Sequence, residues 1–101
     1  MIRHILLYKF REDASAEAIQ ALASKFLECE EKLTGLKKVE HGPNVADNRD
    51  LSRGFNYCFL MTFKDMAEIS EYIASQEHDE IVKLDKPISE GLLVFDMEVE
   101  E

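Results

Sequence analysis

Hydrophobic and polar residues follow a two-residue period in several short stretches, the pattern of β-strands, because successive side chains point to opposite faces. Residues 1–10 contain β-branched and aromatic residues without Gly or Pro, so they are predicted to form a strand. Its two faces are Ile2, His4, Leu6, Tyr8 and Phe10 on one side, and Arg3, Ile5, Leu7 and Lys9 on the other. Both faces have an apolar middle, so we expect cover on both sides. His4 is the polar exception on the more apolar face.

Three further strands are predicted from the same period. Residues 36–41 have the pattern of a half-exposed edge strand, which Gly42-Pro43-Asn44 ends. Residues 55–64 place large hydrophobic side chains on one face, namely Phe55, Tyr57, Phe59, Met61 and Phe63. Residues 91–99 form the last strand, with Leu93, Phe95, Met97 and Val99 on one face and Leu92, Val94, Asp96 and Glu98 on the other.

Helices are predicted where apolar residues recur every three to four positions. The first spans Ala16 to Leu33, with Ser15 as its N-cap and an apolar stripe of Ile19, Leu22, Ala23, Phe26 and Cys29. A second spans residues 66–74 after the cap Asp65. The pattern is lost over residues 75–78, resumes from Asp79 and stops at Pro87, which breaks helices. Residues 46–54 have neither period and are predicted to be an irregular, mobile loop.

The order strand, helix, strand, strand, helix, strand is that of an α+β, ferredoxin-like βαββαβ domain. A four-stranded antiparallel sheet would carry its helices on one face. The other face is also apolar and has no cover within the chain. A second copy stacked on that face would close a dimeric α/β barrel, so we expect a homodimer.

Composition narrows the class of protein. The 101 residues fit one domain, 1–101, and the apolar and charged fractions of 46% and 33% are those of a globular protein. No apolar run approaches the roughly 20 residues needed to span a bilayer. No signal peptide is visible, so a cytoplasmic location is predicted. A net charge of −9 argues against binding nucleic acid or a membrane surface.

The sequence shows no signature of metal, nucleotide or nucleophilic chemistry. Cys29 and Cys58 form neither a disulfide framework nor a metal-binding pair, and both are predicted to be buried. The three histidines have no metal-ligand spacing, so no metal is predicted. Phosphate-binding glycine loops and nucleophile motifs are absent, and we expect no cofactor.

A set of short motifs resembles the stress-responsive dimeric α/β-barrel (Dabb) family. Singly they are weak, but their order and spacing span essentially the whole chain. They are Arg3-His4-Ile5-Leu6-Leu7-Tyr8-Lys9-Phe10, Thr34-Gly35-Leu36, Gly42-Pro43-Asn44-Val45, Gly54-Phe55 with Thr62-Phe63, Tyr72-Ile73 to His78, and Leu93-Val94-Phe95-Asp96. The resemblance implies a homodimer of ferredoxin-like subunits.

The resemblance also implies a site. One branch, the plant olivetolic acid cyclases, closes linear polyketides without a cofactor, and His4, Tyr72 and His78 match its catalytic pattern. By this resemblance His78 is the general base, Tyr72 stabilises an enolate oxygen, and His4 polarises or orients a small carbonyl substrate. An imidazole accepts a proton near neutral pH. We expect a small apolar pocket between sheet and helices, with substrate contacts from Leu6, Tyr8, Leu22 and Phe26.

Structural alternatives to this site stay open. The family often has a His-Pro pair just before the matching histidine, where this chain has Ser75-Gln76-Glu77. His4 can instead be a structural histidine, Tyr72 a core residue, and His78 a solvated residue at a helix start. His41, beside a Gly-Pro turn, is predicted to lie at the surface. The alternative function is a non-catalytic dimer that binds a small ligand or protects under stress.

Overall fold

The computed structural model describes residues 1–100, and its strands form one antiparallel sheet in the order β2-β3-β1-β4. The elements in chain order are β1 (Ile2–Phe10), α1 (Ala16–Lys32), β2 (Leu36–Pro43), α2 (Arg49–Ser52), β3 (Tyr57–Phe63), α3 (Met66–Ile73), α4 (Gln76–Asp85) and β4 (Ser89–Glu98). The predicted ferredoxin-like α+β fold is confirmed, and β2 is an edge strand as expected.

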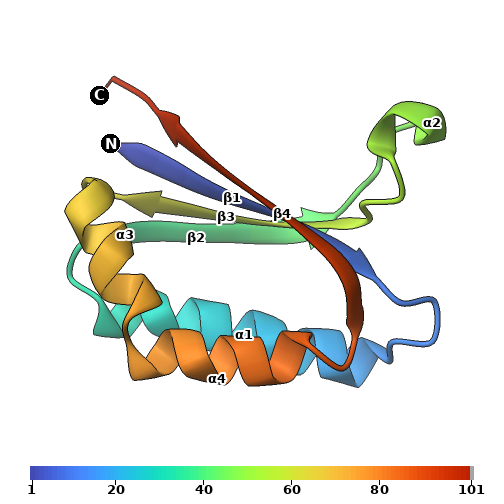
Figure 1. The fold of residues 1–101 in the computed structure, drawn as a ribbon, viewed down its shortest axis with the longest axis horizontal. Coiled ribbons are helices and arrows are strands. Elements are labelled where there is room, and N and C mark those ends of the chain that lie inside the picture. Colours follow the sequence, from blue (N-terminus) through green and yellow to red (C-terminus); the bar gives the residue numbers. More distant parts are fainter. Residues whose placement is uncertain (101) are drawn as a thin grey trace.

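Helices α1, α3 and α4 all cover the same face of the sheet (Figure 1). The alternating burial of β1 explains this placement, because His4, Leu6 and Tyr8 are buried whereas Ile5 and Leu7 are only half-buried. The core lies between that face and the helices. Its largest fully buried side chains are Tyr8, Tyr72, Phe26, Phe59, Phe63, Leu22, Met61, Ile69 and Cys29.

The opposite face of the sheet has no cover within the described residues (Figure 1). On β4, Leu93, Phe95 and Met97 are 42%, 57% and 40% exposed. Antiparallel pairing aligns Phe95 with Ile5 and Leu93 with Leu7 on β1, so these residues form one continuous apolar surface. We call it the open face. Monomers rarely leave so large an apolar surface in water.

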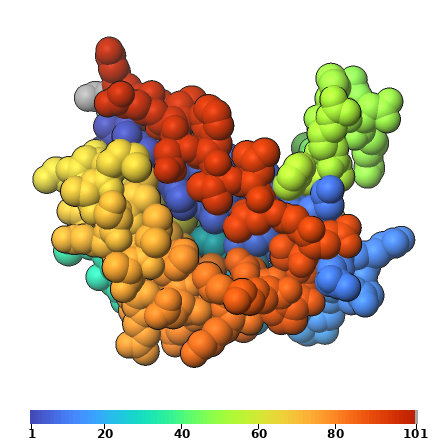
Figure 2. Space-filling view, viewed as in Figure 1, coloured from blue at the N-terminus to red at the C-terminus, as the bar shows by residue number. Residues whose placement is uncertain are grey.

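The segment around α2 departs from the prediction of an irregular loop. Four residues, Arg49–Ser52, form a short helix whose N-cap Asn48 accepts a hydrogen bond from the Leu51 backbone N–H at 3.3 Å. Arg53 and Gly54 then turn the chain back with φ of 55° and 85°. The segment rises on the side of the open face and stands clear of the body of the molecule (Figures 1 and 2).

The second helical region also differs in detail from the prediction. It divides into α3 and α4, and α4 begins at Gln76, three residues before the predicted start at Asp79. The last strand starts at Ser89, two residues before the predicted start at Gly91.

Within residues 1–100, no helix has the length and hydropathy needed to cross a membrane.

Candidate active site

A cavity of about 240 Å³ lies between the sheet and helices α3 and α4. It receives side chains from β1, β4 and both helices: His4, Leu6, Tyr8, Tyr72, Ile73, His78, Ile81, Val82, Asp85, Leu92 and Val94. The structure therefore brings the three predicted catalytic residues, His4, Tyr72 and His78, to one cavity. The predicted small pocket between sheet and helices exists.

His4 is held by a carboxylate on the neighbouring strand. β1 and β4 pair so that His4 lies opposite Asp96, and the Nδ1 of His4 is 2.5 Å from Oδ1 of Asp96. A carboxylate can only accept, so the imidazole donates from Nδ1, and in the neutral form of the ring Nε2 is then the acceptor. The His4 side chain is 6% exposed and that of Asp96 30%. Asp96 thus fixes both the tautomer and the orientation of the ring.

Tyr72 and His78 converge because the chain bends between α3 and α4. Ser75 makes this corner: its hydroxyl donates to the Tyr72 carbonyl at 2.5 Å and accepts from the His78 backbone N–H at 3.2 Å. The rings of Tyr72 and His78 then meet edge to face, with centroids 5.1 Å apart. Residues six apart on one straight helix do not share a face, so the bend is required for this contact.

The Tyr72 hydroxyl is buried and has no hydrogen-bond partner among the described residues. The Tyr72 ring meets both imidazole rings edge to face, with centroids 6.0 Å from that of His4 and 5.1 Å from that of His78. Burial raises the pKa of Tyr72, so it stays a protonated phenol. Buried tyrosine hydroxyls normally find a partner, so this one is a donor left without a partner among the described residues, on a side chain that lines the cavity.

A second polar pair lies further along the same cavity. The Tyr8 hydroxyl donates to Oδ2 of Asp85 at 2.6 Å, and both side chains are buried. Burial raises the pKa of Tyr8, and the hydrogen bond to Asp85 raises it further. Burial also raises the pKa of Asp85, whereas the Tyr8 hydrogen bond and the charges of His78 and Lys86 oppose that shift.

Neither Asp85 nor Asp96 was predicted from the sequence to have a role in the site. For Asp96 a signal existed, since it is a carboxylate on the same predicted strand face as Leu92 and Val94. Asp85 follows His78 by seven residues, two helical turns, and so returns to the same side of α4. This spacing is informative only if His78 and Asp85 lie on one helix, whereas the helix was predicted to start at Asp79, after His78.

The predicted substrate contacts divide into two groups. Leu6 and Tyr8 line the cavity. Leu22 and Phe26 do not; they are fully buried in the core, where Phe26 stacks on Phe59 with ring centroids 4.1 Å apart. Large neighbouring rings take up the space between α1 and the sheet, so the cavity forms beside α4 instead.

The remaining histidine and the cysteines lie away from the cavity. His41 is exposed on β2, as predicted, with Nδ1 2.8 Å from the Tyr57 hydroxyl. Cys29 is buried as predicted, and burial raises its pKa to about 11. Cys58 is only half-buried, contrary to prediction, because it belongs to the open face. No group of His, Cys, Asp and Glu in residues 1–100 is arranged to hold a metal ion.

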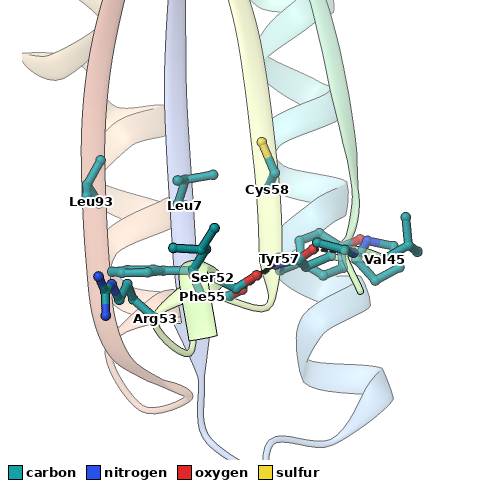
Figure 3. A pocket seen from close by; sticks show the side chains of 12 residues that line it. Leu7, Val45, Ser52, Arg53, Phe55, Tyr57, Cys58 and Leu93 are labelled. Carbon is teal, nitrogen blue, oxygen red and sulfur yellow. Dashed lines mark hydrogen bonds between the residues drawn. The ribbon is translucent and has the colours of Figure 1, made fainter. Parts of the chain in front are cut away.

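A larger, open pocket of about 650 Å³ lies on the open face. Leu7, Cys58 and Leu93 line it from three neighbouring strands, and Phe55 and Arg53 approach from the segment around α2 (Figure 3). Its lining is largely apolar and contains no histidine, so it lacks the acid–base groups of the cavity beneath α4.

The four-stranded sheet, the helices on one face and the cavity between them define a ferredoxin-like α+β domain. A family model described as the stress responsive A/B barrel domain (Dabb) matches residues 2–99, and the chain belongs to that family. The family predicted from the sequence motifs is thereby confirmed.

Individual relatives agree with this assignment. The chain is 26% identical over 95 residues to the stress-response A/B barrel domain-containing protein HS1 of Arabidopsis thaliana, covering 94% of this chain and 86% of that protein. A dimeric ferredoxin-like protein of unknown function from Jannaschia sp. CCS1 has a TM-score of 0.81 and 26% identity, covering 97% and 98% of the two chains. A hydroxynitrile lyase from Passiflora edulis has a TM-score of 0.84 at 20% identity, covering 99% and 94%, which shows a shared fold.

Proposed function

We propose that the chain is a cofactor-independent enzyme that removes a proton next to the carbonyl of a small substrate. The observation that carries this proposal is the buried hydroxyl of Tyr72, which has no partner among the described residues, on a ring that contacts the rings of both His4 and His78. A phenol donor on a side chain that lines a largely apolar cavity suits a carbonyl oxygen that gains negative charge during reaction.

In the proposed step, His78 takes the proton from the carbon next to the carbonyl. The electron pair of that C–H bond forms the enolate C–C double bond, and the carbonyl π pair moves to oxygen. Tyr72 donates a hydrogen bond to that oxygen and keeps its own proton, consistent with its raised pKa. His4, held by Asp96, presents Nε2 as an acceptor and orients the substrate through a hydrogen-bond donor of the substrate rather than through its carbonyl.

Deuterium exchange tests this step without knowledge of the natural substrate. Acetophenone in D₂O exchanges its methyl protons slowly by itself, and ¹H NMR follows the loss of that signal. We expect the wild-type protein to accelerate exchange and His78→Ala to lower the enzymic rate by about 10²-fold or more. Tyr72→Phe removes the oxyanion donor, and a loss of about 10²-fold is expected.

His41→Ala is the matched control, because His41 is an exposed histidine on β2 away from the cavity. It should exchange acetophenone at the wild-type rate. Equal rates for wild type, His78→Ala and a no-protein sample would reject the proposed chemistry.

The fold is shared with a protein named hydroxynitrile lyase, so catalysis does occur on this fold.

A second candidate is a binding protein that uses the same cavity without turnover. The observation that favours it is the burial of His4 and its bond to Asp96, which is also what a structural histidine makes. In that case acetophenone would bind, as seen by shifts of cavity resonances in NMR, but would not exchange. His78→Ala would then leave binding within about twofold.

We further infer that a second copy of the chain covers the open face. Phe95 and Leu93 are exposed there, and Val45 and Leu51, 87% and 71% exposed, extend the apolar surface along the segment around α2. The similar Jannaschia protein is dimeric. Two such faces packed together would form the dimeric barrel expected from the sequence.

A further inference from the structure

The cavity has two polar ends separated by an apolar middle. On β1, His4 and Tyr8 point to the same face four residues apart, which is about 13 Å along a strand. On α4, His78 and Asp85 lie seven residues apart, about 10 Å along a helix. The strand and the helix therefore place one polar pair at each end, with Leu6 between them.

The two ends differ in hydrogen-bonding character. At the first end, the hydroxyl of Tyr72 is a donor without a partner in residues 1–100. At the second end, Asp85 accepts one hydrogen bond, from Tyr8. A carboxylate has about four acceptor positions, so Asp85 can accept further donors from a molecule in the cavity. Leu6, Ile81, Val82, Leu92 and Val94 line the space between the ends.

We infer that Asp85 selects substrates that carry a hydroxyl group at the end opposite their carbonyl. The carbonyl oxygen would accept from Tyr72, the apolar middle of the substrate would contact Leu6 and Val94, and the far hydroxyl would donate to Asp85. This inference rests on the proposed function, which places the reacting carbonyl of the substrate at the end of the cavity near Tyr72. A cavity of about 240 Å³ is below the roughly 300–1,000 Å³ of pockets for drug-sized ligands, so the substrate is small.

Two aryl ketones of matched shape test the inference by binding alone. 4-(Hydroxymethyl)acetophenone and 4-ethylacetophenone differ by a hydroxyl in place of a methyl group at the far end. NMR titration of the whole protein gives a dissociation constant for each. We expect wild type to bind the hydroxymethyl compound about tenfold more tightly, because a hydrogen bond to a charged group is a strong one.

The double variant Tyr8→Phe/Asp85→Leu makes the second end apolar. Replacing both partners of a buried hydrogen bond by apolar groups of similar shape is tolerated, so the variant should fold. The preference should then reverse. We expect 4-ethylacetophenone to bind several-fold more tightly, because its terminal methyl group is buried against the apolar side chains that the substitutions Tyr8→Phe and Asp85→Leu introduce. Tyr8→Phe alone should keep the wild-type preference, since Asp85 remains as the acceptor.

Asp79→Asn is the charge-matched control, because it removes one carboxylate from the exposed side of α4, outside the cavity lining. It should bind both ketones as wild type does. Equal affinity of wild type for the two ketones, or an unchanged preference in the double variant, would overturn the inference. Neither result depends on turnover, so acetophenone exchange that is present without a hydroxyl preference rejects this inference and leaves the proposed function standing.

Discussion

Asp96 decides which ring nitrogen of His4 carries the proton, and this can be measured directly. In Asp96→Asn the amide can donate to Nδ1, which favours the tautomer protonated at Nε2. The ¹⁵N chemical shifts of the His4 ring should move from the Nδ1–H to the Nε2–H pattern.

Glu98→Gln is the control for that substitution, since Glu98 lies two residues further along the same strand and is exposed. It should leave the ¹⁵N shifts of the His4 ring unchanged. A His4 ring that keeps its Nδ1–H pattern in Asp96→Asn would show that Asp96 does not set the tautomer.

Among single residues, the three side chains that meet at the cavity were predictable from the sequence, but the side chains that hold them were not. His4 stood out as a polar residue on an apolar strand face, and the family motifs supplied Tyr72 and His78. The contacts of Asp96 and Asp85 depend on strand register and on the docking of α4, which are long-range properties. Their catalytic and substrate-binding roles stay predictions.

Among the elements, the corner between α3 and α4 depends on Ser75. Ser75→Ala removes the N-cap of α4 and the bond to the Tyr72 carbonyl together. We expect the free energy of unfolding to fall by about 1 kcal/mol, the usual cost of losing such a cap. Urea unfolding followed by circular dichroism measures it, and Ser75→Thr should recover most of the loss.

Ser70→Ala serves as the comparison within the same region, because Ser70 is exposed in the middle of α3 and alanine is a better helix former. Its stability should be unchanged or slightly higher. If Ser70→Ala and Ser75→Ala unfold alike, the capping role of Ser75 is wrong.

The boundaries of helices and strands were predictable where recurring apolar residues show a helical or strand period. β1 and α1 agree with the predicted ranges to within a residue. The start of α4 was missed because residues 76–80 are all polar, so no apolar position shows a helical period before Ile81. α2 was missed because a helix of four residues is too short to show any period.

At the scale of the whole molecule, the apolar residues on both faces of β1 already indicated that something must cover each side. The helices of the same chain cover one face. For the other, the sequence predicted a second copy, and the structure leaves Phe95 at 57% exposure beside the half-buried Ile5. Which chain covers the open face is a property of the assembly and not of one subunit.

Phe95→Glu tests that assembly. A carboxylate placed in the middle of an apolar interface loses its hydration without a partner, so association should weaken by at least about a hundredfold. Sedimentation at micromolar concentration should show a dimer for wild type and a monomer for the variant, with the helical circular dichroism signal retained. Met66→Glu adds the same charge at a similarly exposed position, 49% exposed on α3 away from the open face, and should stay dimeric. A monomeric wild-type protein, or a Phe95→Glu variant that remains dimeric, would remove the open face as the contact between copies.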